Sequence, residues 1–280
     1  MFKPYSYNSE DIQNRIQAIL IEGRKELDVQ KAYRDILSFI DLTTLEGADT
    51  DEKAINLAKQ AGEYFSKEKN IPNVAAVCVY PTLVKVVKEN LEDAHIGVAS
   101  VAGAFPAGQS PIHIKVAEVK YAVEQGADDI DMVISRGKFL EGKYGEVQDE
   151  VKAIKEVCGK AHLKVILETG ELQSVENIRK ASELGILGGG DFIKTSTGKI
   201  PVAATLEAML VMLDTIKEYY DATGKKIGIK PAGGISKPTV ALDYYLLVKE
   251  ILGEEWLSNK LFRIGASRLA NKVYDIIIKD

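Results

Sequence analysis

The stretch HLKVILETGELQSVENIRKASELGILGGGDFIKTSTGK, residues 162–199, contains two short apolar segments separated by a helical pattern. Residues 162–168 form an apolar run typical of a buried strand, and Phe192–Lys194 form a second one. Between them, residues 174–184 have the apolar spacing of an amphipathic helix. Because parallel strands need a crossover that is usually a helix, this order predicts a strand, a helix and a further parallel strand.

The same alternation continues on both sides of this stretch. Further strands are predicted at residues 36–40, 74–79, 96–101, 130–134, 226–230 and 261–265. Further helices are predicted at residues 82–92, 113–125, 137–158, 202–220 and 237–252, with one more that begins near Thr50. Eight strands alternating with helices over about 250 residues predict an α/β fold, the closed (β/α)8 TIM barrel.

The alternative fold is an open, doubly wound sheet. That fold normally carries a glycine-rich turn after its first strand. Here the first predicted strand is followed by Asp41-Leu42-Thr43-Thr44, which has no glycine. Residues 10–33 have helical apolar spacing before the first strand. We therefore predict an N-terminal helical extension over residues 1–33 and a single catalytic barrel domain over residues 34–280.

Composition narrows the range of partners. The 36 basic and 41 acidic residues leave a net charge of −5, so we expect neither nucleic acid nor a membrane surface as a partner. Cys78 and Cys158 are far apart, and His95, His113 and His162 lack a second histidine at metal-binding spacing, so no metal or other cofactor is expected. No apolar run approaches the length of a membrane span, and a cytoplasmic protein is predicted.

Lys194 is the first candidate for chemistry. It ends an apolar strand, where burial disfavours the ammonium and lowers its pKa toward the range in which a free amine attacks a carbonyl. Residues 195–198 are three small hydroxyl residues and a glycine, followed by Lys199, and such a loop can hold a phosphate. A nucleotide P-loop would need a glycine where Ile193 stands and a serine or threonine where Ile200 stands.

A second lysine sits at the end of the next predicted strand. Lys230 and Lys194 end consecutive strands, which places their backbones about 4.8 Å apart if the strands are neighbours. Repulsion between two ammonium groups this close lowers the pKa of one of them. Glycines and a serine follow the last two strands, at Gly233, Gly234, Gly265 and Ser267, where such barrels commonly bind phosphate.

Polar side chains end other predicted strands as well. Asp131 lies inside an apolar run, where an unpaired carboxylate costs several kcal/mol, so it pairs either with a catalytic lysine or with a purely structural cation. Asp41 and Thr43 follow the first strand in the same way. The remaining polar strand-end residues are Cys78, Glu168 and Thr169.

These segments together resemble the deoxyribose-phosphate aldolase family over about residues 35–270. The matching segments are residues 41–45 (DLTTL), 77–81 (VCVYP), 126–131 (GADDID), 164–172 (KVILETGEL), 191–199 (DFIKTSTGK) and 230–234 (KPAGG). The resemblance implies a class I aldolase in which Lys194 forms a Schiff base, Lys230 tunes it, Asp131 takes part in proton transfer and Asp41 hydrogen-bonds within the lysine network. It implies substrate or phosphate contacts by Thr43, Thr195, Gly198, Lys199, Gly233, Gly234, Gly265 and Ser267.

Two positions depart from the family pattern. Many members have two small hydroxyl residues in tandem after the last strand, and here the second is Arg268. Some members end in a tyrosine that assists proton transfer, whereas the last tyrosine here is Tyr274.

The expected activity is a lyase reaction without a cofactor. The resemblance implies reversible cleavage of 2-deoxy-D-ribose 5-phosphate to D-glyceraldehyde 3-phosphate and acetaldehyde, with a sugar phosphate and an aldehyde as partners and a homodimer as the favoured oligomer. Two alternatives remain open. One is another class I aldolase or a sugar-phosphate isomerase on the same barrel, and the other is a sugar-phosphate-binding protein without catalysis.

Overall fold

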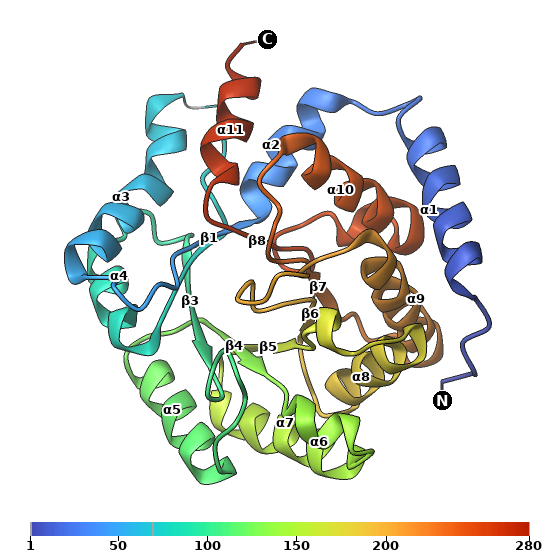
Figure 1. Ribbon diagram of the computed structural model, residues 1–280. Helices are drawn as coiled ribbons and strands as arrows, with labels where there is room; N and C mark the ends of the chain where they lie inside the picture. Colours follow the sequence, from blue (N-terminus) through green and yellow to red (C-terminus); the bar gives the residue numbers. More distant parts are fainter. Residues whose placement is uncertain (1, 69, 280) are drawn as a thin grey trace.

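Eight parallel strands surround a common axis, with helices on the outside (Figure 1). The structure is a computed structural model that describes residues 2–68 and 70–279. The strands pair in the order β7-β6-β5-β4-β3-β2-β1-β8, and the isolated bridges Ile229–Phe262 and Ala232–Gly265 join β7 to β8. The prediction of a (β/α)8 barrel is therefore confirmed.

The strands are short, and nearly all of their residues are buried, as expected for a parallel sheet covered by helices. They are β1 (Ile40–Thr43), β2 (Ala76–Val79), β3 (Gly97–Ala102), β4 (Asp129–Val133), β5 (His162–Ile166), β6 (Phe192–Lys194), β7 (Gly228–Lys230) and β8 (Ile264–Ala266).

The helices follow the strands in alternation. They are α1 (Ser9–Gly23), α2 (Val29–Phe39), α3 (Asp51–Lys67), α4 (Val84–Asn90), α5 (Ile112–Glu124), α6 (Arg136–Leu140), α7 (Tyr144–Cys158), α8 (Val175–Leu187), α9 (Leu206–Thr223), α10 (Pro238–Leu252) and α11 (Leu269–Ile277). Single-turn 3-10 helices occur at η1 (Pro81–Leu83), η2 (Thr169–Glu171) and η3 (Glu254–Trp256).

Side-chain caps fix where several helices begin. Thr50 caps α3, Ser174 caps α8 and Thr205 caps α9, each by accepting a hydrogen bond from a backbone N–H in the first turn. Such a cap satisfies one of the free donors of a helix start and contributes about 1 kcal/mol. These caps set the lengths of the loops that lead from the strand ends into the helices.

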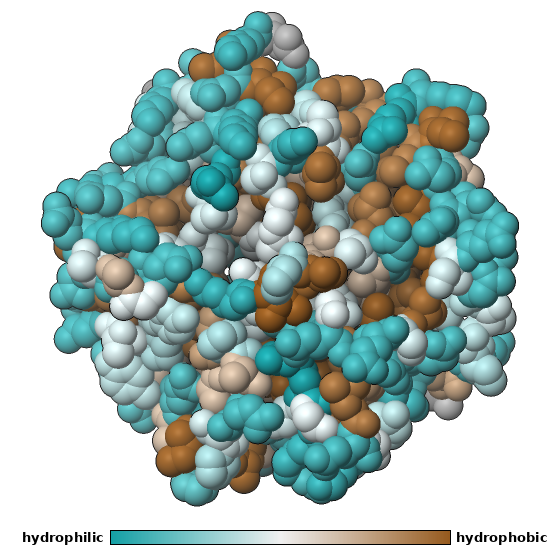
Figure 2. Space-filling model, in the orientation of Figure 1, coloured by the Kyte–Doolittle hydropathy of each residue, from teal (hydrophilic) through white to brown (hydrophobic). Residues whose placement is uncertain are grey.

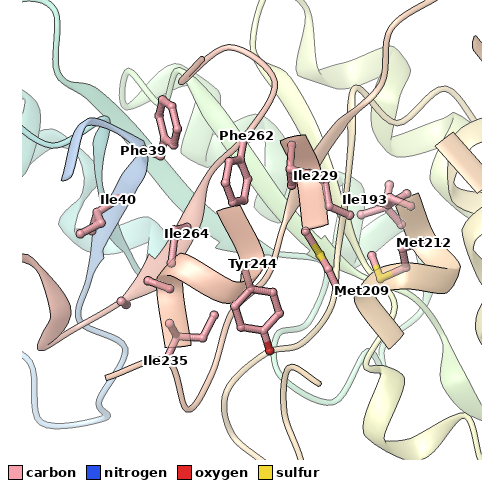
Figure 3. Packing of buried hydrophobic residues seen from close by; sticks show 14 of the residues in the cluster. Phe39, Ile40, Ile193, Met209, Met212, Ile229, Ile235, Tyr244, Phe262 and Ile264 are labelled. Carbon is pink, nitrogen blue, oxygen red and sulfur yellow. The ribbon is translucent and has the colours of Figure 1, made fainter. Parts of the chain in front are cut away.

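The predicted first strand at residues 36–40 is wrong. Helix α2 continues to Phe39, and β1 begins only at Ile40. Ile36, Leu37 and Phe39 are all buried, because α2 packs against both α10 and α11, and their continuous apolar run therefore reads as a strand. The Phe39 ring lies 5.4 Å from the ring of Phe262 (Figure 3).

Several other element boundaries differ from prediction. The helix predicted at 82–92 starts with the 3-10 turn η1. The helix predicted at 137–158 is divided into α6 and α7 by a turn in which Gly142 has φ +78°, a conformation that favours glycine. Strand β8 begins at Ile264 rather than at position 261.

Helix α1 lies outside the ring of barrel helices, beside α9 and α10 (Figure 1). Ile12, Ile16 and Leu20 form its buried face. The predicted division at residues 33 and 34 remains a prediction, and its outer limits, residues 1 and 280, lie outside the described residues. In the described part of the chain, no helix is both long and apolar enough to cross a membrane.

The main core lies between the barrel and its helices. Figure 3 shows Met209 and Met212 of α9 and Tyr244 of α10 packed toward strand residues such as Ile229 and Ile264. Hydrophilic side chains cover much of the outer surface, while paler and hydrophobic residues gather around the centre (Figure 2). The barrel interior is different, because charged side chains occupy much of it.

Candidate active site

Two lysines meet one carboxylate inside the barrel. Lys194 and Lys230 are register partners at the ends of β6 and β7. Both Nζ atoms contact the same oxygen, Asp131 Oδ2, at 2.7 Å for Lys194 and 2.6 Å for Lys230. The three side chains are almost completely buried. The expected neighbouring lysines are therefore present, and Asp131 lies between them.

A second carboxylate contacts Lys230 from the opposite wall. Asp41, at the start of β1, accepts a short hydrogen bond from Lys230 Nζ. Its other oxygen accepts from Arg263 at 2.7 Å, and Arg263 also reaches Asp129 at 3.3 Å. Asp41 thus belongs to the lysine network, as the resemblance implies, and links it to groups deeper in the barrel.

The network includes residues that the sequence analysis did not assign. Lys164 of β5 is fully buried, with its Nζ 2.6 Å from Asp129 and 3.5 Å from Asp131. Lys164 interrupts an apolar run, as Asp131 does, so the same signal could have identified it. Arg263 lies just before β8, inside the apolar run predicted as the last strand, so it carried the same signal.

The network holds more cations than carboxylates. Its charged members are Lys164, Lys194, Lys230, Arg263, Asp41, Asp129 and Asp131. Four cations face three carboxylates, so the set becomes electroneutral when one amine loses its proton. Buried charge without a partner is costly, and this imbalance favours a neutral lysine.

The pKa shifts show which lysine that is. Burial lowers the pKa of Lys194, Asp131 opposes this effect, and the charge of Lys230 lowers the pKa further. For Lys230, burial also favours the neutral amine, but Asp131 and Asp41 outweigh it and raise the pKa. Burial disfavours the charge of Asp131, yet Lys194 and Lys230 hold its pKa well below its usual value. Lys194 is therefore the amine most easily made neutral.

A cavity of about 600 Å³ opens above this network at the carboxyl ends of the strands. Lys194 contributes to its lining, whereas Lys230, Asp131 and Asp41 are buried beneath. Figure 1 shows the loop that follows β6 lying over the middle of the ring. The predicted binding residues that line the cavity are Thr43, Gly198, Lys199, Gly233, Gly234, Gly265 and Ser267.

Thr195 is the predicted binding residue that lies elsewhere. Its side chain is buried, accepts a hydrogen bond from the Ala232 N–H at 3.0 Å and donates to the Ala232 carbonyl at 3.3 Å. These bonds occupy its hydroxyl group and connect the loops after β6 and β7. Thr195 therefore positions the walls of the cavity instead of lining it.

The loop after β6 is held by a buried carboxylate. Glu168 has a left-handed backbone, with φ +57°, and it is fully buried. The Thr197 N–H donates to Glu168 at 3.1 Å, and the Thr197 hydroxyl makes a short bond to the same carboxylate. The Thr197 hydroxyl in turn accepts from the Lys199 N–H at 3.1 Å. Such strain at a non-glycine residue is often found near functional sites.

Close backbone packing explains two of the glycines. Gly198 and Gly233 both have positive φ, +77° and +84°. A Cβ atom added to Gly233 would lie 2.5 Å from Ala203 Cβ and 3.0 Å from Gly198 Cα. A side chain at Gly233 would therefore push apart the two loops that line the cavity.

The described residues contain no cluster of three His, Cys, Asp or Glu side chains arranged to hold a metal ion. Cys78 and Cys158 are both free and buried. Burial raises the pKa of Cys78 to about 11, which keeps this thiol protonated at neutral pH.

Comparison with known proteins identifies the family of this chain. A family model described as "DeoC/LacD family aldolase" matches residues 36–242. The chain belongs to the DeoC/LacD aldolase family. The expectation of a lyase of the aldolase type is thereby confirmed, and it agrees with an amine of lowered pKa at the bottom of a cavity.

The similarity to named relatives extends over most of this aldolase chain. The deoxyribose-phosphate aldolase of Homo sapiens is 46% identical over 247 residues, which are 85% of this chain and 78% of the relative. The deoxyribose-phosphate aldolase of Mus musculus is 46% identical over 278 residues, 95% of this chain and 87% of the relative. A tetrameric deoxyribose phosphate aldolase structure from Aeropyrum pernix superposes with a TM-score of 0.72 at 26% identity, covering 92% of this chain and 96% of that one.

Proposed function

We propose that this aldolase reversibly cleaves 2-deoxy-D-ribose 5-phosphate to D-glyceraldehyde 3-phosphate and acetaldehyde, through a Schiff base on Lys194. One observation carries the proposal: Lys194 lines the cavity with a lowered pKa, beside a second lysine and a shared carboxylate. The names of the relatives support the choice of substrate.

The neutral amine of Lys194 attacks the aldehyde carbon of the open-chain sugar, and loss of water with uptake of one proton leaves a protonated imine. The bond between C2 and C3 then breaks as the C3 hydroxyl loses its proton. The electron pair moves toward the imine nitrogen, which gives an enamine and releases D-glyceraldehyde 3-phosphate. Protonation at C2 and hydrolysis of the imine release acetaldehyde and restore the amine.

The neighbouring groups have separate tasks in this scheme. Lys230 keeps its proton and supplies the charge that lowers the pKa of Lys194. Asp131, which contacts both Nζ atoms, takes part in proton transfer. Asp41 holds Lys230 in place from the other side. The loops with Gly198, Lys199, Gly233, Gly234 and Ser267 receive the 5-phosphate.

Further parts of the proposal concern the setting of the enzyme. Catalysis belongs to residues 34–280, without a cofactor, in the degradation of deoxyribose phosphate from deoxyribonucleotides. A cytoplasmic location is supported by two free, buried cysteines, which suit a reducing compartment. A homo-oligomer, with a dimer favoured, is supported in its general form by the tetramer named for the Aeropyrum pernix enzyme.

Borohydride trapping tests the proposal. The protein is incubated with 2-deoxy-D-ribose 5-phosphate and borohydride, and peptide mass spectrometry locates the reduced adduct. We expect one adduct, on the peptide that contains Lys194, together with release of D-glyceraldehyde 3-phosphate in the untreated enzyme. Substrate binding without adduct or cleavage would favour the non-catalytic binding protein. An adduct formed only with other keto or aldo sugar phosphates would favour another class I aldolase.

A further inference from the structure

The upper wall of the cavity carries three cationic side chains, of which two form ion pairs with carboxylates. Lys53 pairs with Asp49 at 2.5 Å, and Lys199 pairs with Glu46 at 3.0 Å across the cavity mouth. Arg268 also lines the cavity and is exposed, yet no described residue forms an ion pair or hydrogen bond with its guanidinium group. Arg268 is thus the cation of this wall whose charge is not already matched by a carboxylate.

Arg268 lines the same cavity as two free backbone donors. It follows Ser267 directly after β8, and the bridge between Ala232 and Gly265 joins β8 to the segment that continues into the turn at Gly233 and Gly234. Within the described part of the chain, the N–H groups of these two glycines donate to no backbone or side-chain acceptor. A Cβ atom added to Gly234 would meet nothing within 4 Å, so the space in front of it is open. Free N–H groups beside open space suit an anion.

The backbone N–H groups, Lys199 and Arg268 differ in the charge that each can offer to a phosphate. A phosphate monoester carries a charge of about −1.5 to −2 near neutral pH, and backbone N–H groups offer hydrogen bonds without net charge. The ion pair with Glu46 offsets the charge of Lys199, so a phosphate on Lys199 must compete with that carboxylate. The planar guanidinium of Arg268 can form two parallel hydrogen bonds to phosphate oxygens without first breaking an ion pair.

We propose that Arg268 is the specificity-determining residue of this chain for the phosphate of its substrate, and that Glu46 opposes phosphate binding by occupying Lys199. The inference rests on the proposed function, since it concerns the phosphate of that substrate. It goes beyond the resemblance, because the position of Arg268 is one at which this chain departs from the family pattern.

Steady-state kinetics with 2-deoxy-D-ribose 5-phosphate and with 2-deoxy-D-ribose test the inference. For Arg268→Ser we expect the ratio of kcat/KM between the phosphorylated and unphosphorylated sugars to fall about tenfold, mainly through a higher KM for the phosphorylated sugar. Arg268→Lys keeps the charge but loses the planar fork, so its ratio should lie between those of the unmodified enzyme and Arg268→Ser. For Glu46→Gln we expect the opposite sign, a KM for the phosphorylated sugar that is lower by several-fold.

Lys260→Ser is the matched control for the loss of one positive charge. Lys260 is exposed and lies before β8, near the amino ends of the strands and far from the cavity, and we expect its kinetics to match the unmodified enzyme. If Arg268→Ser has the same ratio as the unmodified enzyme while Lys199→Ser lowers it, the inference is wrong and Lys199 binds the phosphate.

Titration with inorganic phosphate separates the two proposals. If the unmodified protein cleaves neither sugar, the proposed function fails, but calorimetry still compares phosphate affinity between the unmodified protein and Arg268→Ser. A dissociation constant that is several-fold higher in Arg268→Ser supports the inference in that case. Equal dissociation constants overturn it.

Discussion

The barrel contains two buried lysine–aspartate pairs that look alike in geometry but differ in access. At the upper end, Lys194 lies 2.7 Å from Asp131, and at the lower end Lys164 lies 2.6 Å from Asp129. Both lysines are buried, yet Lys194 lines the cavity whereas Lys164 is completely enclosed. Burial and the charge of Lys230 lower the pKa of Lys194, the lysine with access to the cavity. Burial alone therefore does not distinguish the two lysines, whereas burial combined with access to the cavity singles out Lys194, the proposed nucleophile.

The largest expected effect comes from removing the accessible lysine. Lys194→Met should abolish borohydride trapping and reduce kcat by at least about 10³-fold, because no other amine can replace the nucleophile. Peptide mapping of the unmodified enzyme is the companion measurement. An adduct on Lys164 would show that access to the cavity does not distinguish the two lysines.

For the free energy of unfolding, we expect the larger effect from replacing Lys164 and the smaller one from replacing Lys194. Lys164→Met should lower the free energy of unfolding by about 3–5 kcal/mol, because it leaves the buried Asp129 with less compensation. Lys194→Met should cost less, since it removes the surplus cation of the network. Urea unfolding of both variants measures the difference, and equal losses would contradict the assignment of Lys194 as the surplus cation.

A change in pH dependence should follow when Lys230 is replaced. In Lys230→Met the positive charge that lowers the pKa of Lys194 is gone, so the pKa of Lys194 rises. The neutral amine then forms at higher pH, and the acidic limb of the residual kcat/KM profile moves upward. Asp131 raises the pKa of Lys194, so the limb for Asp131→Asn should move downward. Shifts in the same direction for both variants would contradict this assignment.

A smaller effect is expected at the loop that covers the cavity. Glu168→Gln weakens the two hydrogen bonds that hold Thr197, and with them the position of the Lys199 backbone. We expect KM for the phosphorylated substrate to rise several-fold with a smaller change in kcat. Thr197→Val should give a similar result. A large fall in kcat with constant KM would instead connect Glu168 to the lysine network.

The smallest expected effect is that of chelation. A protonated imine withdraws electrons as a metal ion does in other aldolases, so dialysis against EDTA should leave kcat/KM unchanged within error. Loss of activity on dialysis, with recovery on addition of zinc, would show that the imine is not the electron acceptor.

The sequence was sufficient for the barrel and for the residues that end its strands. Lys194 and Lys230 could be placed together because β6 and β7 are consecutive and their ends are marked by charged residues in apolar runs. The start of β1 could not be placed, because α2 is buried on more than one side and its apolar run has no clear helical period. The cluster of Lys164, Asp129 and Arg263 depends on distances across the barrel, which periodicity along one strand does not contain.

Loop contacts were equally difficult to predict. The pairs Glu168–Thr197 and Glu46–Lys199 join segments that are far apart in the sequence, and short loops without regular structure give no register from which to infer them. Thr195 was predicted to contact the substrate because its residue type suits phosphate binding. Its hydroxyl is instead hydrogen-bonded to the Ala232 backbone, which the sequence does not reveal.

The ion pairs beneath Lys194 have a kinetic consequence. Lys230, Asp131 and Lys164 are all fully buried and fill the barrel axis below the cavity floor. For the proposed cleavage, both products must leave through the same opening at the loops. In the proposed mechanism, the two-carbon fragment stays attached to Lys194 as the enamine when the triose is released. The proposed mechanism therefore predicts ordered product release, with the triose first, and predicts that in the synthetic direction acetaldehyde reacts with Lys194 before its partner binds.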